Sequence, residues 1–189
     1  MKKLTIFLCL CALLALTACG SNSSNAGGAP SGEPASNSTK GKIYDHKFGE
    51  PFYYNRTNTV TQATSKVALT ISDFEIVKDR ALDDSSDDNY DYIKVLVNAE
   101  NIGDEISTDM AIRISTFQVY DANGKDISEL VIIFNYLDGE FEPAELRPGG
   151  KNEGVMYIPF KEGAVPAELV YFDSVNKKAA STNQYVFKL

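Results

Sequence analysis

The densest group of side chains that could carry out chemistry is an acidic run from residue 83 to residue 91, which reads Asp-Asp-Ser-Ser-Asp-Asp-Asn-Tyr-Asp. Carboxylate and amide oxygens are the ligands that Ca²⁺ prefers. The alternate spacing at the end of the run matches the opening of an EF-hand loop, but Tyr92 and Asn98 stand where that loop needs Gly and Glu. The alternative interpretation is a solvated loop between two strands, whose charges discourage aggregation through sheet edges. The candidate Ca²⁺ ligands are Asp83, Asp84, Asp87, Asp88, Asn89 and Asp91.

A second chemical motif ends the apolar segment at the start of the chain. Two lysines precede a nearly continuous apolar stretch over residues 4–16, which as a helix is roughly 20 Å long and too short for a bilayer core of about 30 Å. A charged start, a short apolar run and small residues before a cleavage point are typical of a secretory signal. The segment ends in Leu-Thr-Ala-Cys, the pattern of a lipobox, in which the sulfur of Cys19 receives a diacylglyceryl group. We therefore expect residues 1–18 to be a lipoprotein signal peptide and Cys19 to be the lipidated mature N-terminus.

Lipidation at this position determines where the protein is expected to reside and which thiols it keeps. Two acyl chains, such as palmitate, hold a protein stably on a membrane, whereas one chain does so only reversibly. Cys9 and Cys11 would leave with the signal peptide, so the mature chain would contain neither a disulfide nor a free thiol. The expected location is the extracytoplasmic face of the cell membrane, at a Gram-positive cell surface rather than in a periplasm. The membrane is thus the first expected partner, through diacylglyceryl-Cys19.

Charge and motif content argue against several functional classes. Loss of the two N-terminal lysines takes the formal net charge from −8 to −10, and an acidic chain without a basic stripe is repelled by nucleic acid and by anionic surfaces. The only histidine, His46, lies beside the expected linker, and a zinc site would need further His or Cys ligands. Neither a Walker loop, a dinucleotide-binding fingerprint nor a Gly-x-Ser-x-Gly elbow occurs. We expect a protein that is not an enzyme, with no cofactor other than Ca²⁺ at the acidic run.

Tyrosine supplies the remaining candidate binding residues. The chain has ten Tyr and no Trp, and Tyr is favoured at interfaces because it joins a large apolar face to a polar tip. The alternative is that these rings belong to the strand surface or to the core. The four tyrosines expected near loops or sheet edges are Tyr53, Tyr54, Tyr90 and Tyr136.

The rest of the chain must form the elements that position these residues. Residues 19–42 are rich in Gly, Ser, Asn, Ala and Pro and are expected to be a flexible linker, with an r.m.s. reach of about 27 Å. Residues 43–189 have the length of one domain. Their apolar residues are mostly β-branched or aromatic and alternate with period two over short runs separated by turn residues. This pattern predicts an all-β, immunoglobulin-like antiparallel β-sandwich of seven or eight strands.

Some expectations are more local. The segment 90–99 has apolar residues on both faces, which predicts a central strand. Alternation over 67–71 continues on the opposite parity at Phe74 and Ile76, which predicts a β-bulge. A similar change of parity occurs between Ile114 and Phe117. The segments 48–57 and 131–136 are expected to be strands, and Pro148-Gly149 a type II turn.

Several of these segments, taken together, resemble a known family. They are the strand at 92–101, the strand and turn at 117–125, the turn at 146–151 and the strands at 154–160 and 167–171. Their order is similar to that in the uncharacterised immunoglobulin-like ectodomains of Gram-positive surface lipoproteins, which are similar in fold to a secreted immunoprotective antigen of mycobacteria. The resemblance implies a fold but supplies no catalytic residues. We therefore expect a membrane-anchored, non-enzymatic module that binds a protein or an envelope component, or alternatively an accessory or sensor lipoprotein that binds a small ligand or Ca²⁺ through the 83–91 loop.

Overall fold

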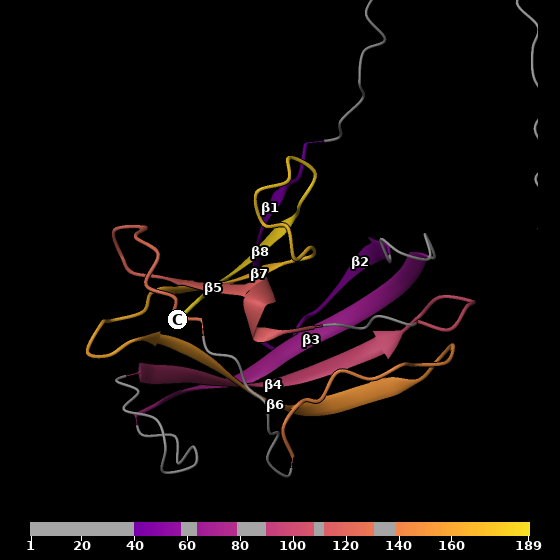
Figure 1. Ribbon diagram of the computed structural model, residues 1–189, viewed down its shortest axis with the longest axis horizontal. Coiled ribbons are helices and arrows are strands. Elements are labelled where there is room, and N and C mark those ends of the chain that lie inside the picture. Colours follow the sequence, from indigo (N-terminus) through magenta and orange to yellow (C-terminus); the bar gives the residue numbers. More distant parts are fainter. Residues whose placement is uncertain (1–39, 58–63, 79–89, 108–111, 131–138) are drawn as a thin grey trace, which may run out of the picture. The chain divides into compact units, whose positions relative to one another are not determined.

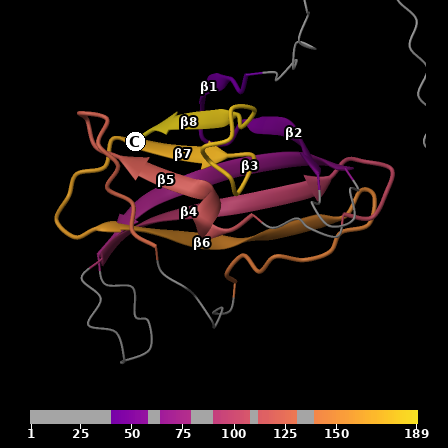
Figure 2. The same cartoon turned by 45° about the horizontal axis from the view of Figure 1, so that its top comes forward.

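The computed structural model describes residues 40–57, 64–78, 90–107, 112–130 and 139–189, and it is built from two four-stranded sheets (Figures 1 and 2). One sheet has the strand order β1-β8-β7-β5 and the other β2-β3-β4-β6. The described residues contain no α-helix and a single 3₁₀ turn, η1. The predicted all-β sandwich of seven or eight strands is therefore confirmed, with eight strands among the described residues. The elements are β1 (Ile43–His46), β2 (Pro51–Thr57), β3 (Thr64–Val77), β4 (Tyr90–Asn101), η1 (Ile114–Thr116), β5 (Phe117–Tyr120), β6 (Lys151–Lys161), β7 (Glu168–Phe172) and β8 (Gln184–Lys188).

Strand β4 is the central strand that its sequence predicts, because it pairs with β3 on one side and β6 on the other. The predicted β-bulge in β3 is also present. Ser72 lies opposite Leu96, and Glu75 lies opposite Lys94. Two residues of β3, Asp73 and Phe74, therefore lie opposite the single residue of β4 that separates Lys94 from Leu96. Asp73 has a φ of 52°, a left-handed conformation that Asp tolerates better than most residues. The bulge turns the side chains of β3 to the opposite face, which explains the change of parity.

The other sheet departs from the wholly antiparallel expectation at its edge. β1 pairs in parallel with β8, with Ile43 opposite Gln184 and His46 opposite Phe187. The chain enters beside the last strand: the Lys42 carbonyl accepts a hydrogen bond from Gln184 N. β1 has only four residues, too few for an alternating pattern to be recognised. For this reason the first strand predicted from the sequence began at residue 48.

Two other expected segments have a different outcome. The run before β5 is not one continuous strand, because Ile114–Thr116 forms the 3₁₀ turn η1 and Thr116 Oγ1 donates to the Arg113 carbonyl. A turn in place of a bend within a strand accounts for the change of parity there. The expected strand at 131–136 lies outside the described residues.

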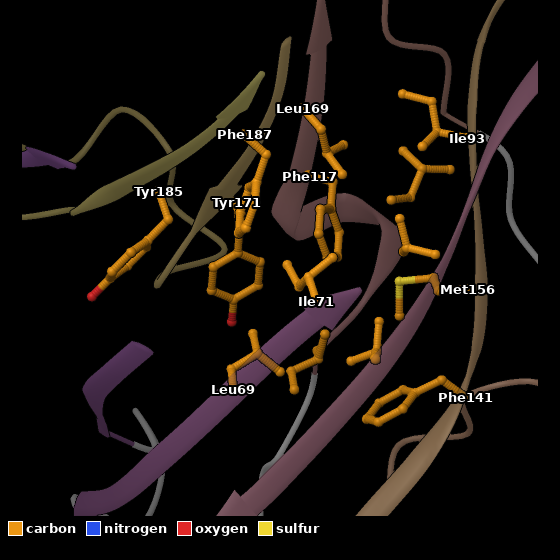
Figure 3. Close-up of a cluster of buried hydrophobic side chains, with 14 of the residues drawn as sticks. Leu69, Ile71, Ile93, Phe117, Phe141, Met156, Leu169, Tyr171, Tyr185 and Phe187 are labelled. Atoms are coloured by element: carbon orange, nitrogen blue, oxygen red, sulfur yellow. The ribbon is translucent and has the colours of Figure 1, made fainter. Parts of the chain in front are cut away.

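The inward faces of both sheets meet in one hydrophobic core (Figure 3). Aliphatic side chains dominate its contribution from β3 and β4, including Leu69, Ile71 and Ile93. Aromatic side chains dominate its contribution from the other sheet, where Phe117, Tyr171, Tyr185 and Phe187 are all buried. This asymmetry concentrates the aromatic rings on the side of the core formed by β5, β7 and β8.

The sandwich is closed along one side. Residues 126–129 run between β5 and β6, with hydrogen bonds from Ile127 N to the Val119 carbonyl, from Lys161 N to the Ile127 carbonyl and from Glu129 N to the Pro159 carbonyl. On the other side, β1 and β2 are the outer strands of their respective sheets and are joined by the turn at 47–50. On that side of the sandwich, the edge of each sheet is therefore formed by one of two consecutive strands, β1 and β2.

Candidate functional site

The four tyrosines proposed for binding occupy different environments. Tyr53 lies on β2 with 62% of its surface exposed. Tyr54 also lies on this edge strand, but it points the opposite way and is only 7% exposed. It therefore follows the alternative interpretation, that the ring belongs to the core, because adjacent residues of a strand face opposite sides. Tyr90 is partly buried at the first position of β4, and Tyr136 lies outside the described residues.

The structure adds two tyrosines that the sequence analysis did not select. Tyr44 on β1 is 39% exposed and stacks on Tyr185 of β8, with ring centroids 5.2 Å apart. Tyr185 also stacks on Phe52 of β2 at 4.2 Å, and its hydroxyl donates to the Tyr53 carbonyl at 3.3 Å. Tyr185 thus spans the gap between the two sheets on the side where β1 and β2 lie. We call the group formed by Tyr44, Tyr53 and Tyr185 the tyrosine edge.

A polar network supports the tyrosine edge from within the core. The hydroxyl oxygens of Tyr54 and Tyr171 are 2.6 Å apart and buried. Burial raises the pKa of Tyr54 to about 12 and that of Tyr171 well above its usual value, while the nearby charge of Arg56 lowers both to a smaller extent. Asp173 is part of the same network, and burial raises its pKa although both of its oxygens accept hydrogen bonds from Asn183. The two phenols are neutral at physiological pH, and the hydrogen bond between their hydroxyls joins β2 to β7 of the opposite sheet.

His46 is built into the aromatic packing beside the tyrosine edge. Its Nε2 donates to the Glu50 carbonyl at 2.9 Å, and its ring packs edge-on against Phe52 and Phe187. The sequence analysis placed this histidine beside the linker, whereas the structure places it in strand β1. Its contacts orient the turn between β1 and β2.

Only one of the six candidate Ca²⁺ ligands lies in the described part of the chain. Asp91 is 5% exposed, and its Oδ2 accepts a hydrogen bond from Gly163 N at 3.0 Å. This carboxylate therefore fastens the turn after β6 to β4. Asp83, Asp84, Asp87, Asp88 and Asn89 lie outside the described residues, and among the residues that are described no group of three or more His, Cys, Asp or Glu side chains is suited to hold a metal ion.

The residues expected to anchor the chain also lie outside the described ranges. Residues 1–39, which include Cys19, are not among the residues that the structure describes. Within the described ranges, no helix has the length and apolar character needed to cross a bilayer.

Comparison with known proteins identifies the fold. No family model and no curated protein matches the chain. Among solved structures, it is similar to MPT63, a secreted protein from Mycobacterium tuberculosis, with a TM-score of 0.53 and 15% identity over 80% of this chain and 100% of that one. It also matches the putative lipoprotein ycdA from Bacillus subtilis (TM-score 0.44, 16% identity, 71% of this chain and 38% of that one). An uncharacterised β-sandwich protein from Clostridium difficile matches with a TM-score of 0.42 and 14% identity over 83% of this chain and 99% of that one. The similarity to MPT63 agrees with the fold that the sequence resemblance implied.

Proposed function

We propose that this protein is a non-enzymatic binding module, anchored by lipid to the extracytoplasmic face of the cell membrane, and that it binds a protein partner through the tyrosine edge. The observation that carries the proposal is the exposure of Tyr44 and Tyr53 on adjoining edge strands of the two sheets. The lipobox ending at Cys19 supports the membrane location, and the resemblance to Gram-positive surface lipoproteins supports the same class of protein.

The tyrosine edge has the physical properties of a binding surface. Tyr44 is exposed on one side and stacked on a buried ring on the other, so its orientation is fixed before a partner arrives. An aromatic side chain held in this way loses little conformational entropy on binding. Its hydroxyl provides a polar tip beside a large apolar face, a combination that is enriched in the energetically important residues of interfaces.

Edge strands favour a protein as the partner. β1 and β2 each have a strand neighbour on one side only within the described sheets, and the edge of a sheet can pair with an extended segment of another chain. The hydroxyl of Tyr185 already occupies one carbonyl on the β2 edge, that of Tyr53. Pairing at β1 would leave this contact intact and place the partner against the exposed faces of Tyr44 and Tyr53.

A cross-linking experiment tests the proposal. A photoreactive phenylalanine analogue replaces Tyr53 in one variant and Val165 in another, because Val165 is also highly exposed and follows β6, away from the tyrosine edge. We expect irradiation of cells to yield a discrete cross-linked protein from position 53 and none from position 165. The double variant Tyr44→Ser/Tyr53→Ser should capture that same protein from envelope extract at least about tenfold less well, as expected for loss of one interface anchor. Equal capture by this variant and by the control Leu130→Ser/Val165→Ser would refute the assignment.

A further inference from the structure

A second surface of the domain lies where the chain enters the sandwich. Gly41 N donates to the Ala180 carbonyl at 2.5 Å, and Lys42 N donates to Asn183 Oδ1 at 3.0 Å. These bonds hold residues 40–42 against the loop between β7 and β8, and Figure 1 shows that loop beside β1. The start of the described chain and this loop therefore form one corner of the domain.

Three lysines at this corner have no ion-pair partner in the described part of the chain. Lys40, Lys42 and Lys178 are exposed, and none of them takes part in an ion pair with any described residue. By contrast, four lysines elsewhere, Lys47, Lys94, Lys151 and Lys188, each lie within ion-pair distance of a glutamate. Three lysines without an ion-pair partner among the described residues stand out in a chain whose formal net charge is −8.

The neighbouring charged side chains leave these cations available. Lys177 is directed inward, where its Nζ donates to the Phe117 carbonyl at 2.7 Å. Asp173 is partly buried, and its carboxylate oxygens accept hydrogen bonds from Asn183. Asp45 is two residues farther along β1 than Ile43, opposite Val186. Lys178 is exposed, whereas the charged groups of Lys177 and Asp173 are engaged in hydrogen bonds within the fold.

Apolar side chains accompany the lysines. Ile43 is 69% exposed and Val175, in the loop between β7 and β8, is 60% exposed. Cations beside exposed apolar groups are the combination that binds an anionic membrane surface, since the charges meet lipid phosphates and the apolar groups enter the interface. We call Lys40, Lys42, Lys178, Ile43 and Val175 the basic corner.

The point at which the chain enters the domain indicates what this surface binds. Lys40 is the first described residue, so the segment that connects the domain to Cys19 leaves from the basic corner. Exposed acidic residues occur on several faces of the domain, among them Asp126, Glu129 and Glu162 in the turns after β5 and β6, and Asp45 on β1. An anionic surface attracts the lysines of this corner and repels the acidic turns, so it favours orientations in which the corner faces it.

We propose that the basic corner rests on the anionic phospholipid bilayer to which the chain is anchored. The inference depends on the membrane location in the proposed function, and it concerns different residues from those of the tyrosine edge. It restricts the domain to a limited set of orientations on the membrane, and because Tyr44 adjoins Ile43, a partner would be received close to the bilayer surface.

Vesicle binding tests the inference without the lipid anchor. The probe is the mature chain, residues 19–189, with Cys19→Ser, sedimented with vesicles of phosphatidylcholine alone or mixed with phosphatidylglycerol. We expect binding to the anionic vesicles only, weakening as salt is raised. Each lysine near the surface contributes about a fivefold increase in partitioning, so the variant Lys40→Gln/Lys42→Gln/Lys178→Gln should lose binding at least about 20-fold.

A charge-matched variant provides the control. Lys78→Gln/Lys125→Gln/Lys161→Gln removes three other exposed lysines and gives the same net charge, so it should retain most of the binding. Equal loss in the two triple variants, or equal binding of the parent chain to neutral and anionic vesicles, would overturn the proposal. Binding to soluble polyglutamate but not to vesicles would also overturn it and would indicate an acidic protein as the occupant. Failure of the cross-linking at Tyr53 would leave the vesicle result unaffected, so the two proposals can fail separately.

Discussion

The hydroxyl oxygens of Tyr54 and Tyr171 lie 2.6 Å apart in the core and join the two sheets by a hydrogen bond between side chains. Tyr54 comes from β2 and Tyr171 from β7, 117 residues apart in the sequence. A buried hydroxyl that loses its partner costs the free energy of desolvation, whereas removal of both partners can be nearly neutral. The pair therefore fixes how β2 is aligned with the opposite sheet.

We expect Tyr54→Phe and Tyr171→Phe each to lower the free energy of unfolding by about 1–3 kcal/mol. The double variant should lose less than the sum of the two, by at least about 0.5 kcal/mol. Urea unfolding followed by circular dichroism measures all three. Tyr120→Phe is the control, because Tyr120 bonds to Gln118 near the surface and its loss should change stability by less than about 0.5 kcal/mol. Additive losses would show that the two hydroxyls act independently.

Alkaline pH should destabilise the fold through the same residues. Burial raises the pKa of Tyr54 to about 12, and it raises the pKa of Tyr171 and of Tyr185 well above the usual value of a phenol. Between about pH 10, where unfolded tyrosine titrates, and pH 12, the folded chain binds more protons than the unfolded chain, so stability falls as pH rises. The stability is fully present well below about pH 10, and Tyr54 alone accounts for a loss of about 2 kcal/mol between about pH 10 and pH 12.

Denaturant unfolding at several pH values between about 8 and 11.5 measures this slope, and tyrosinate absorbance reports the titration itself. The variant Tyr54→Phe/Tyr171→Phe should show a shallower decline, because two of the tyrosines with raised pKa are absent. Titration of all tyrosines of the folded protein at their ordinary pKa would contradict the prediction.

A close backbone approach makes Gly154 indispensable. A Cβ at this position would lie 2.5 Å from both N and Cα of Phe141, while Phe141 N donates to the Val155 carbonyl and Val155 N donates to the Gly139 carbonyl. The two backbones cannot separate without breaking these bonds. Gly154→Ala should therefore destabilise the fold by about 3 kcal/mol, at the upper end of overpacking effects. Thermal unfolding measures this loss. The variant of the exposed neighbour, Glu153→Ala, should stay within about 0.5 kcal/mol of the parent in that assay.

The side chain of Asn101 holds backbone segments together through hydrogen bonds. It is fully buried at the end of β4, where its Nδ2 donates to the carbonyls of Glu105 and Leu146 and its Oδ1 accepts from Gly103 N. Asn101→Ala removes all three hydrogen bonds. Although the Leu146 carbonyl still accepts one from Ser107 N, the loss should cost about 2 kcal/mol. Asn98→Ala is the matched control, since the Asn98 side chain donates to Glu153 at the surface and its loss should be nearly neutral. Equal stability of the two variants would show that the Asn101 network contributes nothing.

The features that could be predicted from the sequence are those that depend on local alternation and turn chemistry. The bulge at Asp73 can be predicted because it reverses which residues face the core, and this reversal shows in the sequence. The turn at Pro148-Gly149 can be predicted because Pro and Gly are the residues that a type II turn favours. In the structure Gly149 takes a φ of 73° and Gly150 N donates to the Arg147 carbonyl. Strand β1 is too short for such a signal, and its parallel pairing with β8 joins opposite ends of the chain.

The candidate site was only partly predictable for the same reason. Which face of β2 meets the core depends on its register with β3, and that register buries Tyr54 and exposes Tyr53. Tyr44 and Tyr185 are 141 positions apart, and they meet only because β1 and β8 pair. The corner lysines were likewise hidden in an acidic composition, because the fold brings Lys40 and Lys42 to the loop that carries Lys178.

The lipid anchor gives the last prediction. Cys19 follows Leu-Thr-Ala at the end of an apolar segment, and diacylation of its sulfur would hold the mature chain on the membrane without a transmembrane helix. Wild-type protein should incorporate a labelled fatty acid and sediment with membranes, whereas Cys19→Ser should incorporate none and leave the membrane fraction. Cys9→Ser/Cys11→Ser is the control, because both residues belong to the segment that we expect to be removed on processing, so their change should leave the anchor intact. After denaturation the mature protein should not react with a thiol-specific dye, and labelling of its N-terminal cysteine would show that the sulfur carries no lipid.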